Sequence, residues 1–249
     1  MIRFILVAAT VILFLILSIP VILVEYLIGK KNRRLRDVSS LAIIQGVFRF
    51  ILWMSGVKIT VKGKENIPAD QAVLYVGNHR SYFDILVGYV TVPGLTGFVA
   101  KKEMEKIPLL STWMKLVNCL FLDRENLKEG LKTILAGIDQ VKHGVSVWIF
   151  PEGTRNEEEN LLNMLPFKEG SLKIAEKSGC PVVPVAITGT AEIFEQHFPK
   201  IRPSHVTMEF GKPYLTKELA PEFKKFPGAY TEEQIKVMLR HELAEGQNL

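Results

Sequence analysis

The pattern of apolar and polar residues divides the chain into two parts near residue 57. Residues 4–28 are almost wholly apolar, and the exceptions are Thr10, Ser18, Pro20 and Glu25. A helix of that length would measure about 37 Å, which is enough to cross a bilayer core of about 30 Å. No small-residue cleavage site precedes the charges that follow, which favours a membrane helix over a cleaved signal peptide. Pro20 and Glu25 each disfavour a straight span, so a shallow arrangement in one leaflet is also credible.

A basic cluster and a second apolar stretch complete this N-terminal part. Lysine or arginine fills five of the seven positions 30–36, and positive residues favour the cytoplasmic side of a membrane and anionic headgroups. Residues 41–57 are apolar but carry Gln45 and Arg49, which makes them a poor spanning candidate. We therefore expect residues 1–57 to form two membrane-attachment helices with a basic loop at 30–36. A single crossing and a hairpin in one leaflet both place residues 58–249 on the cytoplasmic face of the inner or plasma membrane.

Short apolar segments alternate with amphipathic ones through the rest of the chain. The predicted strands are residues 57–62, 72–76, 97–100, 117–122, 145–150, 182–187 and 206–210, and the predicted helices are residues 109–117, 126–143, 170–177 and 231–244. Strands separated by helices predict an α/β fold with a mostly parallel central sheet flanked by helices. Pro184 implies a bulge or an edge position for its strand, because proline lacks the N–H that a central strand donates.

The distribution of charge argues against a nucleic-acid partner, and the cysteines indicate a reducing compartment. The net charge is +5, but the five basic residues at 30–36 account for all of it, since the remaining 26 Lys and Arg equal the 26 Asp and Glu. A nucleic-acid-binding protein would spread its positive charge over a docking face, so we expect no nucleic-acid partner. Cys119 and Cys180 lack CxxC spacing and are typical of reduced core residues in a cytosolic domain.

His79 and Asp84 stand where the second predicted strand gives way to a helix. On a regular helix the five-residue spacing would place them about 140° apart, so they meet only if His79 lies in the loop and Asp84 in the first helical turn. The carboxylate would then hold one ring nitrogen and leave the other free to act as a base. Ser81 and Asp84 also fit a helix-start signature in which the carboxylate caps backbone N–H groups, and this structural interpretation stays open.

Three predicted strands each end in a charged turn, at residues 78–84, 123–124 and 151–155. Because the carboxyl ends of parallel strands meet at one edge of a sheet, we expect a shared crevice there. Arg124 and Arg155 suit a phosphate, which guanidinium groups grip bidentately, and Lys101 would add a point charge. The alternative for Arg124 is a salt bridge to Asp123 or Glu125.

These blocks resemble the lysophosphatidic acid acyltransferase family of membrane glycerolipid acyltransferases. The matching blocks, in order, are Asn-His-Arg-Ser-Tyr-Phe-Asp at 78–84, Phe-Leu-Asp-Arg at 121–124, Phe-Pro-Glu-Gly-Thr-Arg at 150–155, Leu-Pro-Phe-Lys-Glu-Gly at 165–170 and Val-Val-Pro-Val-Ala-Ile at 182–187. Residues 156–164 depart from the family pattern, because they are more acidic and lack an expected glycine. This departure bears on the conformation of that loop.

The resemblance implies a 1-acylglycerol-3-phosphate O-acyltransferase of phospholipid biosynthesis. Such an enzyme moves a fatty acyl group from an acyl carrier protein or coenzyme A thioester to the sn-2 hydroxyl of lysophosphatidic acid, giving phosphatidic acid. His79 would be the general base and Asp84 would fix its tautomer, by the logic of a Ser-His-Asp triad in which the substrate hydroxyl replaces serine. The candidate phosphate-binding residues are Arg124, Arg155 and Lys101. The candidate site-shaping residues are Asn78, Glu152, Gly153 and Thr154. No cofactor and no metal are expected.

Other functions remain open at this point. The acceptor could be glycerol 3-phosphate or another lysophospholipid, and a non-catalytic protein that binds anionic lipid would keep the same fold. A metal-dependent hydrolase would use His79, Asp84 and Glu152 as ligands, but no second clustered histidine completes such a set. A serine hydrolase is disfavoured because the chain has no Gly-x-Ser-x-Gly elbow.

Overall fold

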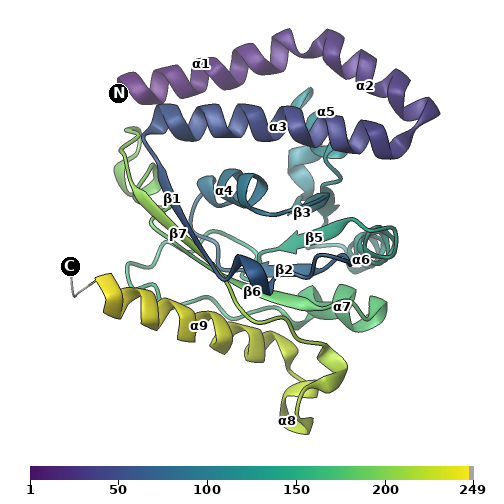
Figure 1. The fold of residues 1–249 in the computed structure, drawn as a ribbon, viewed down its shortest axis with the longest axis vertical. Coiled ribbons are helices and arrows are strands. Elements are labelled where there is room, and N and C mark those ends of the chain that lie inside the picture. The colour runs from purple at the N-terminus through teal and green to yellow at the C-terminus, as the bar shows by residue number, and fades with distance from the viewer. Residues whose placement is uncertain (247–249) are drawn as a thin grey trace.

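A seven-stranded mixed sheet lies at the centre of the computed structural model, which describes residues 1–246 (Figure 1). The strands are β1 (Lys58–Lys62), β2 (Leu74–Gly77), β3 (Thr96–Lys101), β4 (Leu120–Leu122), β5 (Ser146–Ile149), β6 (Val182–Thr188) and β7 (His205–Phe210). Their order across the sheet is β1-β7-β6-β2-β5-β3-β4. The five strands from β6 to β4 are parallel, whereas β7 is antiparallel to β6 and β1 is parallel to β7. The predicted mostly parallel central sheet is therefore confirmed.

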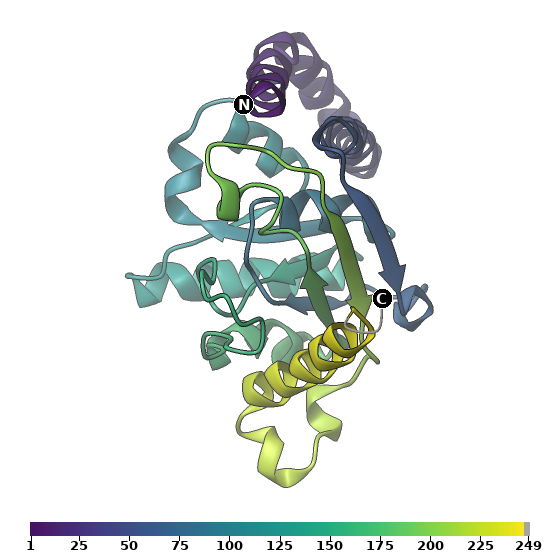
Figure 2. The same ribbon diagram turned by 90° about the vertical axis from the view of Figure 1, so that its left-hand side faces the viewer.

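Helices cover both faces of this sheet (Figures 1 and 2). The helices are α1 (Ile2–Leu17), α2 (Ile19–Lys31), α3 (Arg33–Ser55), α4 (Phe83–Thr91), α5 (Leu110–Leu116), α6 (Leu127–Lys142), α7 (Lys173–Ser178), α8 (Pro221–Lys224) and α9 (Pro227–Gly246). Short 3₁₀ turns lie at Lys64–Asn66, Lys102–Lys106, Glu169–Leu172, Glu195–His197 and Thr216–Glu218. Helices α3, α4 and α5 pack on one face, with α1 and α2 outside them, and α6, α7 and α9 pack on the other.

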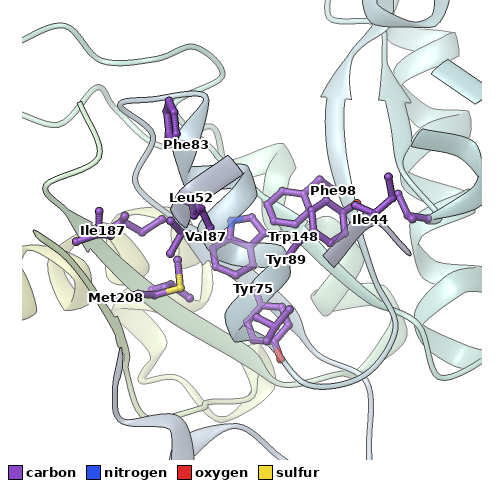
Figure 3. Close-up of a cluster of buried hydrophobic side chains, with 14 of the residues drawn as sticks. Ile44, Leu52, Tyr75, Phe83, Val87, Tyr89, Phe98, Trp148, Ile187 and Met208 are labelled. Atoms are coloured by element: carbon purple, nitrogen blue, oxygen red, sulfur yellow. The ribbon is translucent and has the colours of Figure 1, made fainter. Parts of the chain in front are cut away.

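The central strands β2, β5 and β6 are almost wholly apolar because each side of the sheet has its own core. In β2, Tyr75 packs toward α3 and α4, whereas Leu74 and Val76 pack toward α7 and α9. Trp148 of β5 is fully buried at the centre of the first core, where its ring stacks on those of Tyr75 and Phe98 with centroid distances of 5.2 and 5.1 Å (Figure 3). Burial on both faces explains why these segments are continuously apolar and do not alternate.

The first apolar segment is bent. Ser18 separates α1 from α2, the two helices meet at an angle of 51°, and Pro20 occupies the first turn of α2. The Ser18 hydroxyl accepts a hydrogen bond of 2.8 Å from Trp113 Nε1 on α5, which holds the bend against the sheet domain. Among the described residues, α3 is long and apolar enough to cross a membrane, and the bent pair qualifies as well if it counts as one span. The expectation that residues 41–57 are a poor spanning candidate is thus wrong by this criterion, because the helix extends back to Arg33.

The predicted basic loop at 30–36 is not a loop. Asn32 is its single residue outside a helix, and Asn32 Oδ1 accepts a hydrogen bond of 2.9 Å from Leu35 N, which caps α3. Below this turn the Ser39 hydroxyl donates to Glu25 Oε2 at 2.8 Å, so the buried Glu25 carboxylate joins the two helices. A cap and a cross-helix hydrogen bond therefore make α2 and α3 a tight hairpin with the cations at its tip.

Helix α3 is continuous with the core of the sheet domain. Ile51 and Leu52 are buried in the same cluster as Trp148. Gln45, a polar residue in the apolar stretch, donates through Nε2 to Tyr89 O on α4 at 2.8 Å. The division proposed at residue 57 therefore marks a change in the sequence pattern. The buried packing of side chains continues across it.

Pro184 lies in a central strand, so the predicted edge position is wrong, whereas the predicted bulge is present: Val185 pairs with Phe210 and Val182 with Tyr214, which leaves two residues of β6 opposite three. On one side Pro184 is in register with Val76 of β2. On the other side β7 ends at Phe210, and Pro184 O accepts from Gly211 N at 2.8 Å just beyond that end. The missing proline N–H therefore falls in this irregular step of the pairing, so no ladder hydrogen bond is lost.

Gly97 in β3 offers a test of this packing. A Cβ atom at Gly97 would lie 1.9 Å from the backbone oxygen of Asn118, whereas one at Gly46 on α3 would meet nothing within 4 Å. We expect Gly97→Ala to lower the free energy of unfolding by about 1–3 kcal/mol, because the backbone must move. Gly46→Ala, the matched control, should instead be neutral or stabilising by about 0.5–1 kcal/mol. Urea unfolding in mild detergent measures both, and equal effects would contradict the close approach.

Candidate active site

The three charged turns meet at one edge of the sheet, as the sequence predicts. Strands β2, β5 and β4 are parallel, and each ends immediately before one of these turns. His79, Arg124 and Arg155 line the same cavity, whose volume is about 630 Å³, and so do the other candidates Lys101, Gly153 and Thr154. This volume lies within the range of small-molecule sites. Asn78, Asp84 and Glu152 lie behind these residues as buried supports.

The His79 ring is held by Asp84. His79 Nδ1 and Asp84 Oδ2 are 2.8 Å apart, with His79 in the loop after β2 and Asp84 in the first turn of α4. The same Oδ2 atom accepts hydrogen bonds of 2.8 Å from the backbone N–H groups of Arg80 and Ser81. Both interpretations of the sequence therefore hold, because one carboxylate binds backbone N–H groups in the turn that leads into α4 and also orients the imidazole. No described residue hydrogen bonds to Nε2, which leaves that nitrogen available on the cavity side.

Glu152 fixes the backbone of His79. Its Oε1 accepts from His79 N at 2.8 Å and its Oε2 accepts from Leu165 N at 3.0 Å. Burial raises the pKa of Glu152, while these two N–H donors act in the opposite direction. Asn156 N donates to His79 O at 2.7 Å, and the imidazole stacks on Phe150 with ring centroids 4.0 Å apart. The third block of the sequence therefore serves mainly to hold the histidine of the first.

Asn78 and Gly153 shape the two turns on either side of the histidine. The Asn78 side chain donates to Ile187 O at 2.9 Å and accepts from Ile187 N at 2.8 Å, which joins the end of β2 to β6. Gly153 has φ +79°, a left-handed conformation that favours glycine, and a Cβ atom there would also meet Lys168 Nζ at 2.9 Å. Together these residues allow the turn after β5 to fold back over the turn after β2.

Arg155 points into the cavity from that turn, and its side chain is 31% exposed. Its guanidinium carbon lies 3.9 Å from the centroid of the Tyr82 ring, and NH1 donates to Glu195 Oε1 at 3.1 Å. Arg124 and Lys101 are exposed on the cavity rim, where Lys101 Nζ lies 3.3 Å from Glu103. The predicted cations thus converge on one space, and their role in binding phosphate stays a prediction.

Asp123, one of the two acids predicted as a salt-bridge partner of Arg124, binds backbone N–H groups instead. Asp123 Oδ1 accepts from the backbone N–H groups of Glu125 and Asn126 at 3.0 and 2.9 Å. The Asp123 carboxylate therefore shapes the turn before α6, and Arg124 remains directed to the cavity.

Two charged residues of the site, Arg80 and Glu195, are not among the candidates predicted from the sequence. Arg80 is buried beside His79, and its NH2 group donates to the carbonyl oxygen of Glu158 in the acidic loop. Glu195 belongs to the segment after β6 and accepts from Ser81 Oγ at 2.6 Å as well as from Arg155. The place of Arg80 directly after His79 in the first block is a usable clue, whereas Glu195 becomes recognisable only once the fold is known.

The part of the chain that the structure describes contains no group of three or more His, Cys, Asp or Glu side chains suited to hold a metal ion. Asp84 and Glu152, which a metal-dependent hydrolase would use, direct carboxylate oxygens at backbone N–H groups. These contacts fit a supporting function for both carboxylates.

Most of the cavity wall is apolar. Beyond the polar end at His79, the wall consists of side chains from α1, α3, α4 and α5, including Val7, Phe14, Phe48 and Trp113. The N-terminal helices therefore close the cavity that the sheet edge opens. A molecule with a charged head and a long hydrocarbon tail matches this division of polar and apolar walls.

Comparisons with known proteins agree with this architecture. A family model described as Acyltransferase matches residues 58–188. The 1-acyl-sn-glycerol-3-phosphate acyltransferase of Saccharomyces cerevisiae is 33% identical over 171 residues, which cover 68% of this chain and 55% of that protein. A probable 1-acyl-sn-glycerol-3-phosphate acyltransferase of Mycoplasma pneumoniae is 32% identical over 190 residues, which cover 72% of this chain and 70% of that protein.

A solved structure is similar over nearly the whole length. The crystal structure of the 1-acyl-sn-glycerophosphate (LPA) acyltransferase PlsC from Thermotoga maritima superposes with a TM-score of 0.79 at 27% identity, and the match covers 98% of this chain and 94% of that one. By contrast, the chain spans about half the length of the yeast relative. The family match over more than half of the residues, together with the shared architecture, shows that the chain belongs to the acyltransferase family.

Proposed function

We propose that this protein is a 1-acylglycerol-3-phosphate O-acyltransferase, which transfers a fatty acyl group from a thioester to the sn-2 hydroxyl of lysophosphatidic acid. The observation that carries the proposal is the His79–Asp84 pair, held at 2.8 Å, at the polar end of a cavity that Arg155 and Arg124 also line. The activities in the names of the yeast and Thermotoga maritima proteins support the same assignment.

The chemistry follows from the geometry of the imidazole. Nδ1 of His79 donates to Asp84, so the neutral ring presents an unprotonated Nε2 to the cavity. Nε2 takes the proton of the acceptor hydroxyl as its oxygen forms a bond to the thioester carbonyl carbon. When the carbon–sulfur bond breaks, the imidazolium returns that proton to the thiolate, and the free thiol leaves. General-base assistance of this kind contributes about 10²- to 10⁴-fold to the rate.

The cations set the distance between the acceptor and the base. Arg155, with Arg124 and Lys101 at the rim, binds the acceptor phosphate and thereby places the sn-2 hydroxyl beside His79. The apolar wall from α1, α3, α4 and α5 takes a hydrocarbon chain. Holding the acceptor and the acyl donor in the reactive orientation turns a bimolecular encounter into an effectively intramolecular step, which is a major source of catalytic power.

The N-terminal helices hold this site at a membrane. On α1 and α2 many apolar side chains are exposed, among them Ile5, Ile12, Ile16, Leu23 and Leu27. Exposed apolar area of that extent favours contact with lipid, and the cations at the α2–α3 tip favour anionic headgroups of the cytoplasmic leaflet. Lysophosphatidic acid enters from the bilayer, phosphatidic acid returns to it, and the acyl donor, coenzyme A or acyl carrier protein thioester, arrives from the cytoplasm.

The direct test is incubation of the purified protein in detergent or vesicles with lysophosphatidic acid and each acyl donor. Release of free thiol and formation of phosphatidic acid in equal amounts are expected. A protein that binds anionic lipid without consuming thioester would contradict the proposal.

His79→Ala should abolish most of this activity. We expect kcat to fall by about 10²- to 10⁴-fold, because the general base is gone while the phosphate site remains. His143→Ala is the matched control, since that histidine is exposed at the end of α6 and does not line the cavity. Turnover of His79→Ala at the level of this control would remove the mechanism.

Arg155→Ala should mainly weaken acceptor binding. Loss of a charge-assisted hydrogen bond to phosphate predicts a rise of about tenfold or more in KM for lysophosphatidic acid, with the donor KM changed less than about twofold. Arg202→Ala, which removes an exposed arginine, controls for net charge. An unchanged acceptor KM would show that the phosphate binds elsewhere.

The raised pKa of Glu152 predicts that the free energy of unfolding depends on pH. Burial raises its pKa in the folded chain, so this group stabilises the fold below the ordinary value of 4.5, and the contribution is lost as pH rises through the raised pKa. The difference in unfolding free energy, wild type minus Glu152→Gln, should therefore fall as pH rises from 4.5 toward neutrality. Glu159→Gln, exposed on the same loop, controls for the loss of one charge. A difference that grows with pH would contradict the sign.

A further inference from the structure

Glu195 joins the two turns that carry the proposed base and the proposed phosphate-binding arginine. Its Oε2 accepts from Ser81 Oγ at 2.6 Å, and its Oε1 accepts from Tyr82 N at 2.9 Å, both in the turn between His79 and α4. The same Oε1 accepts from Arg155 NH1 at 3.1 Å, across from the turn after β5. One carboxylate thus links Ser81, Tyr82 and Arg155, which are distant in sequence.

These contacts fix the direction of the Arg155 guanidinium. Tyr82 lies beneath its plane, with 3.9 Å between the guanidinium carbon and the ring centroid, and Glu195 holds one edge through NH1. No described residue hydrogen bonds to the Nε and NH2 groups of Arg155, which lines the cavity. Stacking from one side and a hydrogen bond at one edge leave the opposite edge of the fork for an anion.

The segment that carries Glu195 is itself anchored. The preceding residue, Phe194, stacks on Phe4 of α1 with ring centroids 5.7 Å apart and planes within 9°. Ile193 is fully buried, and its carbonyl oxygen accepts from Arg202 N at 2.9 Å. Glu195 therefore stands on a packed segment and can act as a fixed point for a flexible arginine side chain.

We propose that Glu195 is a positioning residue that sets the distance between the acceptor phosphate and His79 by holding Arg155. This inference rests on the function proposed above. A carboxylate beside an arginine lowers the positive potential that attracts phosphate. The contribution of Glu195 therefore comes from its reach, that is, from how far its side chain extends its oxygens toward Arg155, and not from its charge. The structure gives a way to separate reach from charge, because both oxygens have defined partners.

Two substitutions make that separation. Glu195→Gln keeps the length of the side chain, since the amide oxygen can take the place of Oε1 at Tyr82 and Arg155 while the NH2 group donates to Ser81 Oγ. Glu195→Asp keeps the charge but shortens the side chain by one methylene, which withdraws the carboxylate from Arg155.

The experiment measures kcat and KM for lysophosphatidic acid at saturating acyl donor in both variants and in Arg155→Ala. Glu195→Asp should raise the acceptor KM by about tenfold and lower kcat, because a displaced phosphate misaligns the hydroxyl. Glu195→Gln should stay within about threefold of the wild type. In the Arg155→Ala background, Glu195→Asp should change kcat/KM by less than about twofold, since the group it positions is absent.

Each other outcome overturns the proposal in a distinct way. Greater damage from Gln than from Asp would show that charge, and not reach, is what matters. Equal losses in the wild-type and Arg155→Ala backgrounds, with a matching fall in melting temperature, would show a merely structural function. Wild-type kinetics in both variants would show that Glu195 does not act on Arg155. If the wild-type protein makes no phosphatidic acid at all, the proposed function fails, and this result is separate from those three.

Discussion

The site depends on one oxygen atom, Oδ2 of Asp84. It accepts hydrogen bonds from the imidazole of His79 and from the backbone N–H groups of Arg80 and Ser81, in the turn just before α4. The N-terminus of a helix favours the negative charge of a carboxylate in its first turn. The helix therefore stabilises the carboxylate, and the carboxylate fixes the tautomer of the histidine. The His-x₄-Asp spacing has this geometry because His79 lies before the helix and Asp84 within its first turn.

The rest of the architecture brings other groups to this point. The parallel strands β2, β5 and β4 end at one edge, so three turns that are well separated in sequence share a cavity. Glu152 holds the backbone of His79 from the β5 turn, and Asn78 ties the end of β2 to β6. The N-terminal helices then supply an apolar wall. Under the proposed function, the same helices attach the enzyme to the membrane and line the path of the hydrocarbon tail of the lipid substrate.

Much of this could be predicted from local sequence. Apolar runs that end in charged turns revealed the parallel strands, and the spacing of His79 and Asp84 revealed their pairing. The errors have physical causes outside local pattern. Pro184 is tolerated in a central strand because the pairing to the neighbouring segment bulges beside it, and residues 30–36 form a tight hairpin because Glu25 and Ser39 meet across it. Glu195 could not be found from sequence, since its importance arises from contacts with Ser81 and Arg155 that only the fold creates.

The central claim is that one lysolipid molecule meets both Arg155 and His79. The most direct measurement is the structure of the protein in complex with lysophosphatidic acid, in the absence of an acyl donor. We expect the phosphate on the free edge of the Arg155 guanidinium and the sn-2 hydroxyl within about 2.6–3.2 Å of His79 Nε2. A phosphate bound away from Arg155, or a hydroxyl that cannot reach Nε2 while the phosphate is bound there, would contradict it.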